Sequence, residues 1–296
     1  MPLRIKWKRF AAIFSAAAAL LTGCTGKDSG SGQSAVSKAD VPAVTGDVTV
    51  TVFDVGKADA MVIQTANSVT VVDAGNKGDG KDIEQFLTAQ GIDTIDTLMI
   101  THYDKDHVGG AARLVNRMNV GTIYVPDYTA SSEEYQSFME KITEKGKELT
   151  KMAAGTAQSW VSDDASFQLF AANKTNYGKN EENDFSLVLY VQHGENTLLF
   201  AGDAEEARQQ EIMAMSLGEV TFLKFPYHGK YLSTTENFLN AVNPKYTVIC
   251  CSNQEYADPS TVQTLKDRGV EAYYTPDGTV TAVSNGKTMT LTQAAK

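Results

Sequence analysis

Residues 97–110 read TLMITHYDKDHVGG, an apolar run that passes directly into a polar loop. The run is rich in branched and apolar side chains, which is typical of a buried strand. Four potential metal ligands follow it: His102, Asp104, Asp106 and His107. Lys105 is the only cation among them, so ion pairs do not account for all four groups. Because the carboxyl ends of strands hold ligands in open α/β sheets, this segment predicts a metal site.

Two later strands end in a similar way. LLFAGDA (198–204) brings Asp203 to the end of one strand, and FLKFPYHGK (222–230) brings His228 to the end of another. A lone aspartate before a helix is usually a cap, and a lone histidine in a turn is usually packed. Three of the four histidines nevertheless follow strands, so we interpret them as parts of one site. The fourth, His193, lies in YVQHGEN, and we expect a solvent-exposed turn residue there.

Strands and helices alternate from residue 47 onward. Three short β-type runs, at 48–55, 60–66 and 68–75, are expected to pair as a meander. Ser131 and Glu134 have the spacing of a capping box. The patterns predict helices at 81–90, 109–118, 131–146, 204–217, 234–242 and 259–268, and further strands at 97–101, 166–171, 185–192, 196–200, 220–224, 245–251, 271–275, 278–284 and 287–292. This alternation predicts an α/β body in which helices cover two sheets or one large one.

The N-terminus has the features of an export signal. A basic start precedes the apolar run 10–21, which as a helix would span about 18 Å, short of the roughly 30 Å hydrocarbon core of a membrane. The following LTGC resembles the lipobox of bacterial lipoproteins, which implies acylation of Cys24. We therefore expect a signal peptide at 1–23, a flexible tether at 24–46 and one folded domain at 47–296. The expected location is the outer side of the bacterial cell membrane.

The charge of the chain limits its partners. The 296 residues carry a net charge of −10, and removing the four basic residues of segment 1–23 leaves 22 basic against 36 acidic residues, or −14. Such a body does not attract nucleic acid or anionic membrane through its overall field, so a polyanionic substrate requires local charge or bound metal. Cys250 and Cys251 end the apolar run TVICC, which favours two core thiols over a disulfide between neighbours.

The motifs together resemble a known family. They occur in the order FDVGKADAMVIQ (53–64), VVDAGN (71–76), GIDTIDTLMITHYDKDHVGG (91–110), NDFSLVLYV (183–191), LLFAGD (198–203) and LKFPYHGK (223–230). This order of motifs is similar to that of the metallo-β-lactamase fold. Within that fold the chain is most similar to the ComEC-type branch, named after the C-terminal domain of the competence protein ComEC. The resemblance covers about residues 48–292. It implies an αββα sandwich, two mixed sheets covered by helices.

The resemblance also implies two divalent metal ions, zinc or manganese. Their ligands would be His102 and Asp104 for the first, Asp106, His107 and His228 for the second, and Asp203 as the bridge. Asp106 and Asp203 are thereby assigned a catalytic role. Asp73 would support the site by accepting hydrogen bonds that orient the ligands.

The chain departs from the family pattern at several positions. Asp104 stands where the general fold has a histidine, and a carboxylate favours manganese or magnesium as well as zinc. The usual histidine of the third motif is absent, so two alternatives are open: Asn183 or Asp184 completes the first metal, or that metal site is weak. Lys57 and Lys230 would add positive charge at the substrate mouth.

These observations favour a lipid-anchored hydrolase that cleaves phosphodiesters with a water activated by two metals. DNA, a nucleotide or a cell-wall component is the expected substrate, and the lipid anchor is the expected membrane contact. The alternative is a surface lipoprotein with a degenerate site that serves binding or DNA uptake without turnover. A true β-lactamase is disfavoured, because that activity normally uses imidazole at the position of Asp104.

Overall fold

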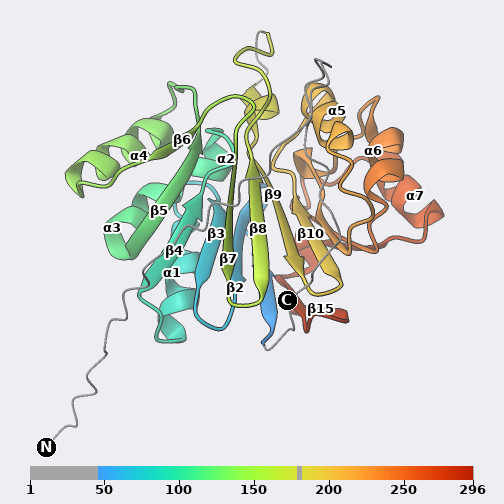
Figure 1. Cartoon of the computed structure of the whole chain (residues 1–296), viewed down its shortest axis with the longest axis horizontal. Helices are drawn as coiled ribbons and strands as arrows, with labels where there is room; N and C mark the ends of the chain where they lie inside the picture. Colours follow the sequence, from blue (N-terminus) through green and yellow to red (C-terminus); the bar gives the residue numbers. More distant parts are fainter. Residues whose placement is uncertain (1–45, 179–181, 296) are drawn as a thin grey trace, which may run out of the picture. The chain divides into compact units, whose positions relative to one another are not determined.

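The computed structural model describes residues 46–178 and 182–295 (Figure 1). All the described residues belong to one compact unit. The predicted signal peptide, the tether up to residue 45 and Cys24 lie outside the described residues. Among the described helices, none is long and apolar enough to cross a membrane.

The first sheet has eight strands. In spatial order these are β15 (Met289–Gln293), β14 (Val280–Ser284), β1 (Val48–Val52), β2 (Ala60–Gln64), β3 (Val69–Ala74), β4 (Thr94–Met99), β5 (Asn119–Pro126) and β6 (Thr150–Met152). Strands β1 to β3 pair antiparallel, which confirms the predicted meander. Strands β3 to β6 are parallel, so their carboxyl ends share one edge of the sheet.

The second sheet has seven strands. Their order is β13 (Glu271–Tyr274), β12 (Tyr246–Ile249), β11 (Phe222–Lys224), β10 (Asn196–Phe200), β9 (Val188–His193), β8 (Ala165–Phe170) and β7 (Ala157–Ser162). Strands β10 to β13 are parallel, and β7 to β10 are antiparallel. The parallel strands β10 and β11 again deliver the residues that follow them to one edge.

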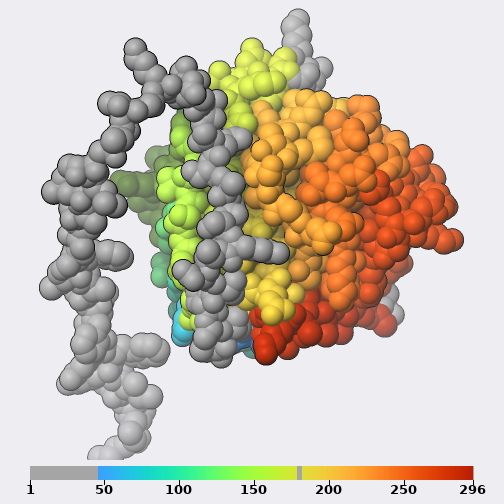
Figure 2. All heavy atoms as spheres, turned by 45° about the vertical axis from the view of Figure 1, so that its right-hand side comes forward, coloured from blue at the N-terminus to red at the C-terminus, as the bar shows by residue number. Residues whose placement is uncertain are grey.

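Helices cover the outer face of each sheet. The first sheet packs against α1 (Gly80–Ala89), α2 (Lys105–Val108), α3 (Ala111–Arg117) and α4 (Glu133–Glu144). The second packs against α5 (Glu206–Ala214), α6 (Thr235–Val242) and α7 (Pro259–Asp267), which form a continuous orange to red surface in Figure 2. The described residues also form three short 3-10 turns, η1 (Glu182–Phe185), η2 (Tyr227–Gly229) and η3 (Thr275–Asp277). These layers confirm the predicted αββα sandwich.

The alternation of side chains along the strands builds three apolar layers. Val50 of β1 and Phe200 of β10 lie in the layer between the sheets. Phe138 of α4 is fully buried in the layer outside the first sheet, and Phe238 of α6 in the layer outside the second. Full burial of one such ring stabilises the fold by about 1.5–3 kcal/mol. The three layers therefore hold in place the two sheet edges at which the parallel strands end.

Several local predictions were wrong. The helix expected at 109–118 forms as α3 but begins only at Ala111, and α2 is a separate short helix that was not predicted. Gly109 and Gly110 lie between the two helices and touch neighbouring backbone: a Cβ on Gly110 would lie 2.1 Å from the carbonyl oxygen of Ala74. The cap of α4 is Ser132 rather than Ser131, and its Oγ accepts from the Tyr135 amide over 3.3 Å. Strands β5, β6 and β7 were not predicted.

His193 is also a correction. It ends β9 with only 1% of its surface exposed, so it is not a solvent-exposed turn residue. Its Nδ1 lies 2.8 Å from Oγ of Ser284 on β14, and this contact joins the two sheets. The prediction of two core thiols is confirmed, since Cys250 and Cys251 are both buried and free.

Candidate metal centre

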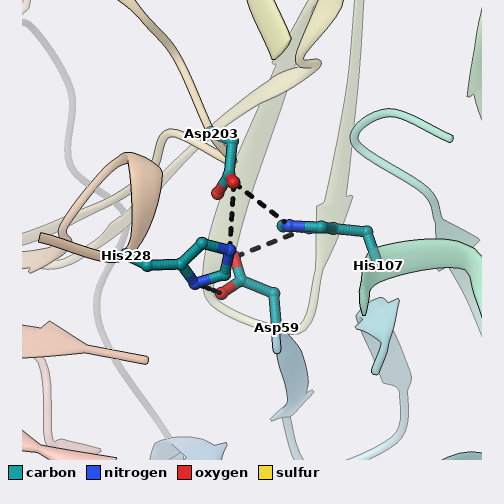
Figure 3. Close-up of side chains that lie close together, drawn as sticks. All are labelled: Asp59, His107, Asp203 and His228. Atoms are coloured by element: carbon teal, nitrogen blue, oxygen red, sulfur yellow. Dashed lines mark ion pairs between the residues drawn. The ribbon is translucent and has the colours of Figure 1, made fainter. Parts of the chain in front are cut away.

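Four side chains converge where the two sheets present their loops (Figure 3). One ligand atom from each lies within 4.8 Å of the others, and all four residues are buried: Asp59, His107, Asp203 and His228. They come from the start of β2, from α2, and from the turns after β10 and β11. The carboxyl ends of parallel strands thus supply three of the four.

His107 is oriented by Asp73. Its Nδ1 lies 2.9 Å from Oδ2 of Asp73, while its Nε2 lies 3.4 Å from Oδ2 of Asp203. A carboxylate can only accept here, so Nδ1 donates and the lone pair of Nε2 is directed at the site. Asp73 is itself held by Thr101, whose amide and hydroxyl each donate to it over 2.7 Å.

His102 is oriented through the same aspartate. Its Nδ1 lies 3.1 Å from Oγ1 of Thr101. Because that hydroxyl already donates to Asp73, it accepts from His102, whose Nε2 then carries the lone pair. This Nε2 lies 3.7 Å from Oδ2 of Asp104, whose side chain is 44% exposed. The pair of His102 and Asp104 therefore forms the solvent-facing end of the centre.

His228 is held by a backbone carbonyl. Its Nδ1 donates to the oxygen of Cys250 over 2.9 Å, and its Nε2 lies 3.0 Å from Asp203 and 3.4 Å from Asp106. Tyr227 and His228 both have left-handed backbone, with φ of 49° and 50°. Such a conformation costs about 1–2 kcal/mol for a residue other than glycine, so the fold maintains strain where it presents His228.

The donor set fits divalent metal ions. The Nε2 atoms of His102, His107 and His228 are buried and have no hydrogen-bond partner. A buried polar atom without a partner is costly, and such atoms in native structures indicate a bound water or ion. Imidazole Nε2 together with carboxylate oxygen is the ligand chemistry of zinc and manganese sites.

The charges support the same conclusion. Five carboxylates lie in or beside the cluster, on Asp59, Asp73, Asp104, Asp106 and Asp203, and Lys224 is the buried cation among them. With neutral histidines this leaves a charge of −4, which two divalent ions would neutralise. Burial opposes ionisation of Asp203, but His228, His107 and Lys224 hold its pKa well below the usual range.

His107 and His228 favour their protonated forms when no metal is bound. Burial opposes protonation of His228, yet the charge of Asp203 and the nearness of the Asp106 carboxylate raise its pKa to about 9. The pKa of His107 is raised in the same way by Asp203, Asp73 and Asp59, again against burial. A metal ion therefore has to displace protons from these nitrogens.

The two candidates for the third motif have different contacts. Asp184 Oδ1 accepts from the amides of Glu205 and Arg208, both over 3.0 Å, at the start of α5. Asn183 donates to Glu205 over 2.7 Å, and its Oδ1 is buried without a hydrogen-bond partner. Asn183 thus has the available oxygen, whereas Asp184 stabilises the first turn of a helix.

The two lysines predicted at the substrate mouth are more exposed than the four clustered side chains. Lys57 lies 3.8 Å from Glu255, with 29% of its side chain exposed. Lys230 is exposed and directly follows η2. Both flank the loops that carry the cluster, at the start of β2 and after β11.

Sequence reasoning missed Asp59 and Lys224. Asp59 is fully buried and forms an ion pair with Nζ of Lys224. The available signals were an aspartate between two buried alanines in KADAM and a lysine inside the apolar strand FLK.

Comparison with known proteins agrees with this arrangement. Residues 53–252, more than half of the chain, match the Metallo-beta-lactamase superfamily. The chain belongs to this superfamily. Among solved structures, the metallo-beta-lactamase fold protein YhfI from Bacillus subtilis is similar in fold, with a TM-score of 0.51 at 12% identity over 78% of this chain and 96% of that one.

Curated relatives place the chain in the ComEC-type branch. It is 28% identical over 176 residues to ComE operon protein 3 of Bacillus subtilis, covering 59% of this chain and 22% of that protein. It is 28% identical over 206 residues to competence protein ComA of Neisseria gonorrhoeae, covering 68% of this chain and 27% of that protein. The chain thus matches about a quarter of the length of each relative. The predicted family is confirmed.

Proposed function

We propose that the protein is a metal-dependent phosphodiesterase or nuclease, anchored through acylated Cys24 to the outer side of the bacterial cell membrane. The observation that carries the proposal is the set of three buried, unpartnered Nε2 atoms that face carboxylates. They support two metal positions, one at His102 and Asp104 and one at His107, His228 and Asp106, with Asp203 between them.

Two divalent ions would lower the pKa of a water at this site and stabilise the negative charge that develops at phosphorus. The residues of the chain prepare the site for this chemistry. Asp73 and Thr101 fix the tautomers of two histidines, and the Cys250 carbonyl fixes that of His228. Asp203, with its lowered pKa, remains an anion whose Oδ2 is directed at two imidazoles.

Asp104 favours phosphodiester over β-lactam chemistry. A carboxylate at this position supplies a hard oxygen ligand, which suits manganese as well as zinc. A phosphodiester transition state spreads charge over several oxygens, and two ions that contact the attacking and leaving oxygens match that distribution. We therefore propose zinc or manganese as the metal and expect no cephalosporin turnover.

The acidic body favours a small or single-stranded substrate. Residues 24–296 have 22 basic and 36 acidic residues, and their net charge of −14 repels long duplex DNA except where metals and nearby lysines compensate. Lys57 and Lys230 are the lysines proposed for this role. DNA, a nucleotide and a cell-wall phosphodiester remain the proposed substrates, and catalysis is expected to depend only weakly on salt.

A second candidate is a role in DNA uptake at the cell envelope without turnover. The observation that favours it is the similarity to a competence protein and a ComE operon protein. The absence of a third-motif histidine is consistent with a site that binds rather than cleaves.

One experiment separates these functions. The protein is loaded with manganese or zinc and offered linear DNA, a chromogenic phosphodiester and a chromogenic cephalosporin. We expect phosphodiester cleavage that manganese increases and a chelator abolishes. A metal-loaded protein that is inert towards every diester supports the binding role, and rapid cephalosporin hydrolysis contradicts both candidates.

Anchoring has its own test. In a bacterial host, Cys24→Ser should leave the protein unacylated, since the thiol is the acceptor. Acylation is measured by incorporation of labelled fatty acid and by membrane fractionation. An unchanged membrane fraction and unchanged mobility of the variant would exclude lipidation at Cys24.

A further inference from the structure

Lys224 is a cation in an apolar setting. It ends β11 after Phe222 and Leu223, and none of its surface is exposed. A lysine at such depth loses its charge or destabilises the fold unless acidic partners compensate. The groups that contact Lys224 therefore determine whether it stays charged at this depth.

Three oxygens surround the ammonium group. Lys224 pairs with the carboxylate of Asp59, donates to the carbonyl oxygen of Gly202 over 3.0 Å, and lies 3.5 Å from Oδ1 of Asp203. The contacts with Gly202 and Asp203 are hydrogen bonds, and the contact with Asp59 is an ion pair. Lys224 thereby joins the start of β2 to the turn that carries Asp203.

The two oxygens of Asp203 face different groups. Oδ1 faces Lys224, whereas Oδ2 lies 3.4 Å from Nε2 of His107 and 3.0 Å from Nε2 of His228. The ammonium group thus fixes the rotation of the Asp203 carboxylate and directs Oδ2 at the imidazoles.

Asp203 lies at the Nε2 atoms of the His107 and His228 rings, whereas Asp59 lies nearest their Nδ1 atoms. Its oxygens are 3.8 Å from Nδ1 of His107 and 3.7 Å from Nδ1 of His228, the ion pairs that Figure 3 marks with dashed lines. Those Nδ1 atoms already bond to Asp73 and to the Cys250 carbonyl. Asp59 is close enough to belong to the cluster, but it faces the side of the rings that ligands do not use.

We propose that Lys224 is a positioning residue: paired with Asp59, it fixes Asp203 so that Oδ2 faces the metal site, and it keeps Asp59 out of the ligand set. This inference rests on the metal-dependent function proposed above.

The test is the double variant Asp59→Asn/Lys224→Met, which leaves the net charge unchanged. Buried ion pairs can often be replaced by neutral groups without loss of the fold. In the full chain, we expect wild-type manganese stoichiometry by titration with the metal alone. We also expect an altered electron paramagnetic resonance spectrum of the manganese pair and a kcat lowered by about 10–100-fold, the usual effect of losing a ligand-orienting partner. Lys245→Met, at an exposed lysine before β12, is the control and should match the wild type.

Other outcomes overturn the proposal. Loss of one manganese ion in the double variant means that Asp59 is a ligand. A wild-type spectrum and kcat with only a lower melting temperature mean that the pair is merely structural. If the double variant does not fold, Asp59→Leu/Lys224→Met replaces both groups by apolar ones and gives the same comparison. A wild-type chain that binds manganese but cleaves no diester contradicts the proposed function, while the spectrum still decides the role of Lys224. A wild-type chain that binds neither manganese nor zinc overturns both proposals.

Discussion

Asp73 accepts a hydrogen bond from Nδ1 of His107 over 2.9 Å, and this contact determines which nitrogen of His107 faces the site. The same carboxylate accepts from Thr101, whose hydroxyl accepts in turn from His102. One buried aspartate therefore sets the tautomers of two histidines. Asp73 has a left-handed backbone, with φ of 55°. This conformation is costly for a residue other than glycine, which indicates that it is retained because it places the carboxylate beside His107 and Thr101.

Asp73→Asn should reverse the tautomer of His107. Its amide can donate to Nδ1, which would place the ring proton on Nε2 and remove a ligand lone pair. We expect metal affinity and turnover to fall by about 10–100-fold, measured by manganese titration and diester cleavage. Asparagine tolerates left-handed backbone, so the fold should persist.

Asp163→Asn is the matched control for this variant. Asp163 also has positive φ, 51°, but it lies in the exposed turn between β7 and β8. It should bind metal and turn over as the wild type does. Equal behaviour of the two variants would show that Asp73 does not act through His107.

Thr101→Val tests the hydroxyl that connects Asp73 with His102. Valine keeps the branched shape but leaves Nδ1 of His102 without its acceptor. We expect less metal at the solvent-facing end, seen as stoichiometry below that of the wild type, while Thr101→Ser retains it. Metal content unchanged in the valine variant would remove Thr101 from the orientation of His102.

His107→Ala and His228→Ala each remove an imidazole from the buried end of the centre. We expect metal content to fall and activity to drop by about two orders of magnitude or more. His193→Ala should differ from both, because His193 joins β9 to β14 away from the cluster. It should lower the melting temperature and leave metal per folded chain unchanged. Full metal content and activity in the first two variants would refute the proposed ligands.

The sequence reveals residues of the site where a local pattern marks them. His107, Asp203 and His228 each follow an apolar run, so their position after a strand is enough to group them. Asp59 and Lys224 lack such a pattern, because their pairing joins segments distant in the chain and depends on which strands become neighbours. His193 shows the same limit. Its sequence HGEN is typical of a turn, but packing against Ser284 of the other sheet buries it.

Metal affinity should rise with pH. The pKa of His228 is about 9 without metal, above its ordinary value of 6.5, so at neutral pH a metal ion has to displace a proton from it. Apparent manganese affinity is therefore expected to increase between about pH 6.5 and 9. Isothermal titration calorimetry in buffers of different ionisation enthalpy measures the protons released. Binding without proton release would contradict the protonated state of the histidines.

His193 should make the fold sensitive to mild acid. Burial lowers its pKa below 6.5, although a backbone hydrogen bond to Gly46 and the charges of Asp164 and Asp47 oppose this. The unfolded chain then binds the proton more readily than the folded chain, so stability is fully present above about pH 6.5 and is lost as the pH falls through and below that value. His193→Gln can still bond to Ser284 but does not titrate. Urea unfolding at pH 7.5 and 5.5, with metal removed from both proteins, should show a larger loss for the wild type than for the variant. Because the histidines of the metal centre titrate equally in both proteins, an equal loss would show that His193 does not contribute to the pH dependence.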